Sequence, residues 1–150
     1  VKDIETIASE KVLVLNLSRQ VSSSPFVVTR YLTSKDYEKA LLASDAALMI
    51  RNDSIVNRVA VPIKFLEYIS KSLPIVANRS VDSVVKYIQQ TKQGVIINSL
   101  DEITTDLISS LVKMRTEADR ANCAQWLRSH ELPKVAEKYQ SIYASILSTN

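Results

Sequence analysis

Residues 46–78 read AALMIRNDSIVNRVAVPIKFLEYISKSLPIVAN, and this stretch decides the fold. Its first five residues, 46–50, form a short apolar run of the kind that parallel sheets bury on both faces. Pro62 suits the first turn of a helix ending near Lys71, because its fixed φ is preorganised there and its missing N–H would be unpaired anyway. A second apolar run at 74–78 follows. Strand, helix and strand in this order predict a right-handed βαβ crossover, with residues 51–61 as a polar, irregular connection.

The alternation of strands and helices continues on both sides of this stretch. Ser34 is the expected cap of the next helix upstream, and Ser99 with Glu102 has the spacing of a capping box. Gly94 is expected to end a helix in the left-handed conformation. We therefore predict an α/β fold, a Rossmann-like parallel sheet flanked by helices, with further C-terminal helices, as one domain over residues 1–150. The further strands are expected at 12–17, 26–29 and 95–97, and the further helices at 1–8, 34–43, 81–91, 99–115 and from Pro133 onward.

Rare residue types exclude several common kinds of site. The chain of 150 residues is about one domain long and contains one cysteine, one histidine and one glycine. A zinc cage needs about four Cys or His ligands, a disulfide needs a second cysteine, and phosphate-binding loops need several glycines. We expect Cys123 to be a small core residue and His130 to be a solvated residue between helices, with no nucleophile beside it.

The charge pattern argues against a nucleic-acid partner. The net charge is +3, but the lysines and arginines are scattered and form no basic arm or stripe interleaved with aromatic residues. No apolar run approaches the roughly 20 residues of a membrane span, and the first residues lack a signal-peptide pattern. We expect an intracellular chain, and the start at Val1 rather than Met indicates a piece of a longer protein.

The segment after Ile50 is the richest in functional groups. Phe65, Leu66 and Ile69 recur at helical spacing and form the expected inward face of the predicted helix. Lys64, Glu67 and Lys71 recur at spacings of three and four, so they share another side of it. An ordinary solvated ion pair is one interpretation of this stripe. The other is a ligand site, because the first turn of a helix at the carboxyl edge of a sheet stabilises an anion, and a carboxylate one turn later can accept hydrogen bonds from a ribose. A phosphate site next to a diol acceptor indicates a nucleotide.

Three motifs in this region resemble a known family. They are Ser44-Asp45-Ala46-Ala47, then Asn57-Arg58-Val59-Ala60-x-Pro62-x-Lys64-x-x-Glu67-Tyr68, then Leu73-Pro74-Ile75-Val76-Ala77. In this order and spacing they resemble the C-terminal domain of GT-B-fold glycosyltransferases, in particular glycosyltransferase family four, over roughly residues 26–147. The resemblance implies the donor half of a two-domain enzyme of polysaccharide biosynthesis, which binds a UDP-, GDP- or ADP-sugar and needs no catalytic metal or further cofactor.

The same resemblance implies roles for individual residues. Glu67 matches the glutamate that holds the ribose hydroxyls, and Lys64 lies on the side that faces the diphosphate. Tyr31 and Leu32 match a loop that packs on the nucleobase. Negative charge grows on the diphosphate as the sugar–phosphate bond breaks, so positioned cations lower the barrier. The residues expected to act on the leaving group are Lys64 and Arg58, and those expected to contact the donor are Glu67, Lys64, Arg51, Asn57, Tyr31 and Leu32.

The implied partners extend beyond this chain. The glycan or lipid-linked acceptor would be bound by an N-terminal domain outside this sequence, so we expect the 150 residues alone to transfer nothing. The intact enzyme would be cytoplasmic, with peripheral association at the inner face of a membrane. These are expectations from the family rather than from composition.

Three departures from the family pattern keep an alternative open. Val59 stands where many retaining members have a second glutamate, and Ser72 stands where a glycine is usual. The glycine-rich turn expected at the start of the domain is missing. The sequence therefore leaves open whether the transfer retains or inverts the configuration at the anomeric carbon. The alternative function is a non-catalytic Rossmann-like interaction module that has lost its nucleotide site.

Overall fold

The computed structural model describes residues 14–16, 27–29, 32–117, 120–130 and 132–147. Strands β3 (Ala47–Met49), β4 (Ile75–Ala77) and β5 (Gly94–Ile96) form a parallel sheet in that order, with Ala47 opposite Ile75 and Ile75 opposite Gly94. Strands β1 (Val14–Asn16) and β2 (Val27–Thr29) pair in parallel as a separate two-stranded sheet. The predicted α/β class and the parallel strand arrangement are confirmed.

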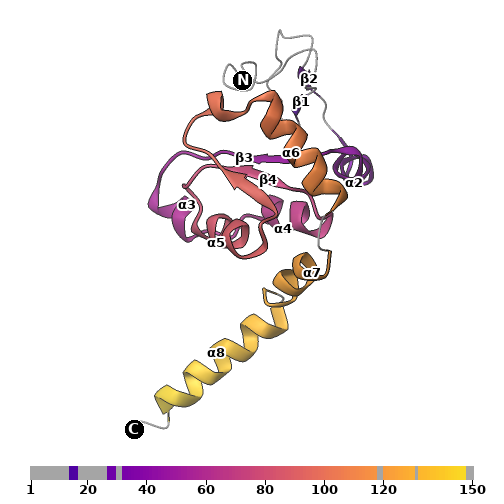
Figure 1. Cartoon of the computed structure of the whole chain (residues 1–150). Coiled ribbons are helices and arrows are strands. Elements are labelled where there is room, and N and C mark those ends of the chain that lie inside the picture. The colour runs from indigo at the N-terminus through magenta and orange to yellow at the C-terminus, as the bar shows by residue number, and fades with distance from the viewer. Residues whose placement is uncertain (1–13, 17–26, 30–31, 118–119, 131, 148–150) are drawn as a thin grey trace.

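Seven α-helices and one 3₁₀ turn accompany the strands in the described residues (Figure 1). Figure 1 shows α6 on one side of the three-stranded sheet and α4 and α5 on the other, with α8 extending away from the body. The predicted helix 1–8 lies outside the described residues. The helices are α2 (Ser34–Ala43), α3 (Ile55–Val59), α4 (Ile63–Ser70), α5 (Asp82–Thr91), α6 (Thr105–Thr116), α7 (Arg120–Arg128) and α8 (Leu132–Leu147), and the 3₁₀ turn is η1 (Leu100–Glu102).

Alternation along β4 divides the core between the two faces of the sheet. Ile75 and Ala77 pack in a cluster with residues of α4, α5 and α7, whereas Val76 packs with Leu111 of α6. All three strand residues are 1% exposed or less, as expected for a parallel strand covered on both faces. β4 is thus the central strand by burial as well as by order.

An aromatic cluster joins α4, α5 and α7. The rings of Phe65, Tyr87 and Trp126 meet edge to face, with centroids 5.1–5.4 Å apart. Cys123 is 1% exposed, which confirms it as a core residue, and its Sγ lies 3.3 Å from the Tyr87 hydroxyl. His130 is exposed after α7 as predicted, and its ring stacks on Trp126 at 3.7 Å. The expectation that no nucleophile lies beside it was wrong, because the Ser129 hydroxyl lies 2.9 Å from His130 Nδ1.

Several expected boundaries were wrong, and capping explains three of them. The segment 51–61 contains α3, because the Ser54 hydroxyl accepts a hydrogen bond from the Asn57 N–H and starts a helical turn. Thr33 rather than Ser34 caps α2. The Ser99–Glu102 capping box is present but starts only η1, and a second cap at Thr104 begins α6. Pro62 occupies the N-cap of α4, one residue before the first helical position.

The predicted role of Gly94 was also wrong. Lys92, with φ +58°, is the left-handed residue that ends α5, and Gly94 begins β5 with φ +150°. A Cβ at Gly94 would lie 2.3 Å from the carbonyl oxygen of Ile75. Glycine is needed here because β5 starts in close approach to β4, so its function is packing between strands.

Candidate functional site

A cluster of three polar side chains joins α2 to α4, which we call the Glu67 cluster: Tyr37, Lys64 and Glu67. The Tyr37 hydroxyl donates a hydrogen bond of 2.8 Å to Glu67 Oε2, and Lys64 Nζ lies 3.0 Å from the same oxygen. Lys64 Nζ also lies over the Tyr37 ring, 3.8 Å from its centroid. The predicted partnership of Lys64 with Glu67 is therefore present, and Tyr37 is a third member.

Packing between α2 and α4 sets the geometry of this cluster. Leu41 of α2 and Leu73, just after α4, are buried together, and Tyr37 and Tyr68 pack against them. Lys71 of the α4 C-terminus pairs with Glu38 of α2. Phe65 and Ile69 are buried on the inward face of α4, and Leu66 is partly buried against the same core, as the periodicity predicted. Lys64 and Glu67 are therefore directed along the side of α4 toward α2.

The Glu67 cluster lines an open pocket of about 580 Å³ between α2 and α4. Leu32, which precedes α2, forms part of its wall. Three of the residues predicted to contact a donor, namely Leu32, Lys64 and Glu67, thus share one pocket. Tyr31 lies outside the described residues. The side chains of Lys64 and Glu67 are 52% and 34% exposed, so both are accessible to a ligand.

The other predicted site residues lie elsewhere. Arg58 forms a bidentate ion pair with Asp53, in which Nε donates to Oδ1 at 2.8 Å and Nη2 donates to Oδ2 at 2.6 Å. Arg58 also lines a second pocket of about 440 Å³. The Asn57 amide donates to the Asn52 carbonyl at 2.9 Å. The backbone of Arg51 is bonded to the Asn78 side chain in both directions. The structure does not bring Arg51, Asn57 or Arg58 into the wall of the Glu67 pocket.

Burial and the carboxylate of Glu67 both raise the pKa of Tyr37, burial contributing more. Tyr37 therefore stays protonated at neutral pH and acts as a hydrogen-bond donor. No motif pointed to Tyr37. The available signal was its spacing of four from Leu41, which places Tyr37 on the inward side of α2.

In the described part of the chain, the start of α4 has two unpaired backbone donors, at Ile63 and Lys64, and Lys64 is a lining residue of this pocket. Pro62 provides no side-chain cap, and the N–H groups of Ile63 and Lys64 have no acceptor among the described residues. Unpaired N–H groups at a helix start, together with the dipole of the helix, stabilise an anion. The local chemistry of α4 therefore combines anion donors at residues 63–64 with a carboxylate acceptor at Glu67.

Comparison of the chain with protein families, with curated proteins and with solved structures gives no match. In the described residues, no helix combines the length and apolar character needed to cross a bilayer.

Proposed function

We propose that this chain binds the nucleotide portion of a nucleoside-diphosphate sugar, as the donor half of a GT-B glycosyltransferase. The observation that carries the proposal is the shared pocket of Leu32, Lys64 and Glu67. The Glu67 carboxylate can accept hydrogen bonds from ribose hydroxyls, the Lys64 ammonium group can pair with phosphate, and Leu32 offers an apolar surface to the base. The sequence resemblance to family-four enzymes supports the same assignment.

Glycosyl transfer breaks the bond between the anomeric carbon and the diphosphate oxygen, and the acceptor hydroxyl forms the new bond to that carbon. The diphosphate leaves with an added negative charge. Lys64 and the N–H groups of Ile63 and Lys64 would stabilise that charge, which lowers the barrier. The acceptor and the group that takes its proton would come from another domain.

Glu67 has one oxygen for a ligand and one already in use. Oε2 accepts from Tyr37 and pairs with Lys64, whereas no described residue donates to Oε1. A ribose hydroxyl can bond Oε1 without disturbing the cluster. If a second ribose hydroxyl bonds Oε2 as well, Tyr37 or Lys64 has to move from that oxygen, and Lys64 would then turn toward the phosphates.

Thermal unfolding with UDP, GDP and ADP tests the proposal. A ligand at 100 times its dissociation constant adds about 2.7 kcal/mol to the free energy of unfolding. We expect one of the three nucleotides to raise the melting temperature, and Glu67→Gln to abolish that increase. Glu38→Gln is the matched control, because Glu38 lines the same pocket but pairs with Lys71 instead. If none of the nucleotides has an effect, the proposal is wrong.

The alternative, a non-catalytic interaction module, is favoured by one specific observation. The two partners of Glu67 Oε2 belong to the chain itself, so the cluster is satisfied without a ligand. In that case Tyr37, Lys64 and Glu67 simply hold α2 against α4. Glu67→Gln would then lower stability equally with and without nucleotide.

A further inference from the structure

Residues 51–61 connect β3 to α4, and we call them the α3 connection. At its start, the carbonyl oxygen of Arg51 accepts hydrogen bonds from Asn78 Nδ2 at 2.6 Å and from Ser80 Oγ at 2.8 Å. The N–H of Arg51 donates in turn to Asn78 Oδ1, at 3.3 Å. Asn78 directly follows β4, and Ser80 is only 6% exposed. The end of β4 therefore fixes the point at which the chain leaves β3.

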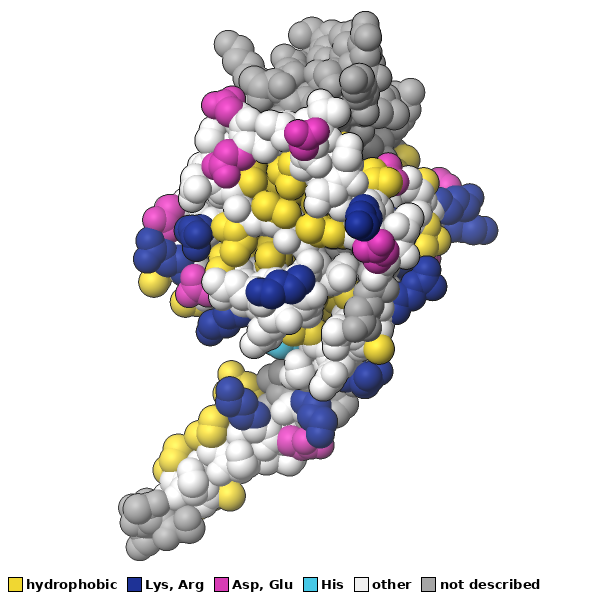
Figure 2. All heavy atoms as spheres, viewed as in Figure 1, with side chains coloured by type: hydrophobic (Ala, Val, Ile, Leu, Met, Phe, Trp, Pro, Cys, Tyr) yellow, Lys and Arg dark blue, Asp and Glu magenta, His cyan; other side chains and the backbone are white. Residues whose placement is uncertain are grey.

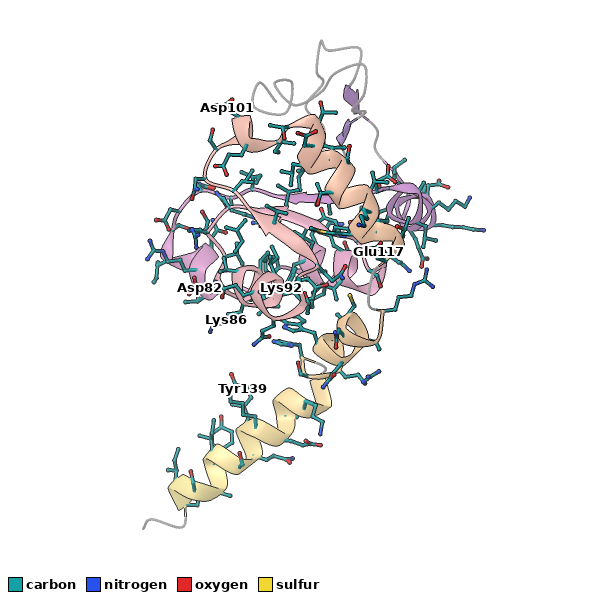
Figure 3. All side chains as sticks on the ribbon, viewed as in Figure 1. Asp82, Lys86, Lys92, Asp101, Glu117 and Tyr139 are labelled. Atoms are coloured by element: carbon teal, nitrogen blue, oxygen red, sulfur yellow. The ribbon has the colours of Figure 1, made fainter. Side chains whose placement is uncertain are left out.

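A second hydrogen bond fixes the other end of the α3 connection. Ser83 Oγ donates to the carbonyl oxygen of Ala60 at 2.9 Å, just before the N-cap of α4. In the described residues, this is the one hydrogen bond that joins residues 60–62 to a part of the chain other than α3 and α4. Ser83 follows Asp82, which Figure 3 shows at the start of α5, the helix that packs beside α3. Because Val84, the next residue, is 0% exposed, Ser83 belongs to a firmly packed part of the fold.

Bonds within the α3 connection link its two ends. The Arg58 guanidinium pairs with Asp53 through two hydrogen bonds, and the Asn57 amide donates to the Asn52 carbonyl. Figure 2 shows basic and acidic side chains next to each other at the edge of the molecule where Figure 1 places α3. Asn57 and Arg58 therefore bond within the α3 connection, away from the Glu67 pocket.

The first turn of α4 depends on the α3 connection for its position. Ile63 is 74% exposed and the Lys64 side chain is 52% exposed, so neither is packed into the core. The middle of α4 is different, because Phe65 and Ile69 are 0% and 1% exposed there. The Ser83 hydrogen bond thus acts on the part of α4 that has no buried side chain of its own.

We propose that Ser83 is a positioning residue for the phosphate end of the nucleotide site. Its hydroxyl fixes where α4 begins, and there Lys64 and the N–H groups of Ile63 and Lys64 would contact the diphosphate. Groups that bind a ligand have to be held to within about 0.5 Å, and the residues behind them supply that precision. This role of Ser83 rests on the proposed binding of a nucleotide.

Ribose recognition should not depend on Ser83. Glu67 lies beyond the first turn of α4, and Tyr37 of α2 donates to it at 2.8 Å. Its position is therefore set by the buried middle of α4 and by α2. Loss of the Ser83 hydroxyl should accordingly weaken the contacts with phosphate and leave those with the nucleoside intact. A residue that only stabilises the fold would weaken both.

Titrations of the full 150-residue chain, followed by NMR, test this role. The probes are UDP, GDP and ADP, and the nucleoside of each base. For the nucleotide that binds, we expect Ser83→Ala to lower the affinity by about threefold to tenfold and to leave the affinity for its nucleoside within about twofold. Ser83→Thr keeps the hydroxyl and should bind as the wild-type chain does. Ser109→Ala is the matched control, because Ser109 Oγ also donates to a backbone carbonyl at 2.9 Å, in α6.

Circular dichroism melts of each variant check that it is folded. Equal weakening of nucleotide and nucleoside binding in Ser83→Ala would overturn the positioning role, and so would unchanged binding of both or an equal loss in Ser109→Ala. In these cases the wild-type chain still binds the nucleotide, so the proposed function stands. If the wild-type chain binds none of the nucleotides, the proposed function is wrong and the role of Ser83 is wrong with it.

Discussion

Tyr37 and Glu67, thirty residues apart in the chain, lie with the phenolic oxygen 2.8 Å from carboxylate oxygen Oε2. This contact ties α2 to α4 and occupies one oxygen of the residue expected to bind ribose. Burial and the neighbouring carboxylate raise the pKa of Tyr37, so the hydrogen bond is present throughout the neutral range. The state of the candidate site therefore depends on both residues.

Removal of the Tyr37 hydroxyl should change alkaline stability. A raised pKa in the folded chain favours the protonated phenol, so the stabilisation is full below the ordinary tyrosine pKa of about 10 and is lost as pH rises through the raised value. We expect the wild-type melting temperature to fall above pH 10, and Tyr37→Phe to show a smaller fall. Tyr68 and Tyr87, whose pKa values are also raised, keep the variant partly sensitive. Parallel pH curves for the two proteins would contradict this prediction.

Ser72→Gly should stabilise the fold. Ser72 follows α4 with φ +52°, a left-handed conformation that costs a non-glycine residue about 1–2 kcal/mol. Glycine adopts this conformation without that cost, but it loses more backbone entropy on folding. We therefore expect Ser72→Gly to raise the free energy of unfolding by up to about 1 kcal/mol. Urea unfolding measures the change, and a loss of stability would show that the serine side chain has a stabilising contact.

Gly94→Ala should have the opposite effect. The new Cβ would lie 2.3 Å from the Ile75 carbonyl oxygen, so β5 would have to move away from β4. We expect a loss of about 1–3 kcal/mol in the free energy of unfolding. Lys92→Gly, at the neighbouring left-handed position, is the control and should not destabilise. If Gly94→Ala proves as stable as the wild-type chain, β5 can move away from β4 without a loss of stability, and the prediction is wrong.

Deletion of residues 136–150 should leave the body of the fold intact. Every side chain at 136–147 is exposed, including Tyr139 and Tyr143, and Figure 3 shows Tyr139 on α8, away from the sheet. We expect the deletion to change the free energy of unfolding by less than about 0.5 kcal/mol. Phe65→Ala, in the buried aromatic cluster, should lower it by about 3–5 kcal/mol. Thermal unfolding followed by the fluorescence of Trp126 compares the two. A large drop on deletion would show that α8 contributes to the core.

The sequence predicted the elements whose signal is local. Strands β3 and β4 and helix α4 follow from apolar runs and from the periodicity around Phe65 and Ile69. Helix α3 was missed because its aliphatic residues face outward, so no buried stripe marks it. The role of Gly94 depends on how closely β5 approaches Ile75, which is a property of the assembled sheet.

The candidate site was predictable in part for the same reason. Lys64 and Glu67 are one helical turn apart, so their proximity follows from spacing alone. Tyr37 reaches them only because α2 packs on α4, a long-range contact that no local pattern encodes. Arg58 looked equally available by sequence, but its nearer partner Asp53 holds it at another pocket.

Calorimetric titration of UDP, GDP and ADP into the wild-type chain and into Glu67→Gln tests the central claim most directly. Hydrogen bonds to a charged group contribute about 1.5–3 kcal/mol, so the account predicts saturable binding of one nucleotide that weakens by roughly tenfold or more in the variant. The absence of binding to the wild-type chain, or equal affinity in the two proteins, would contradict it.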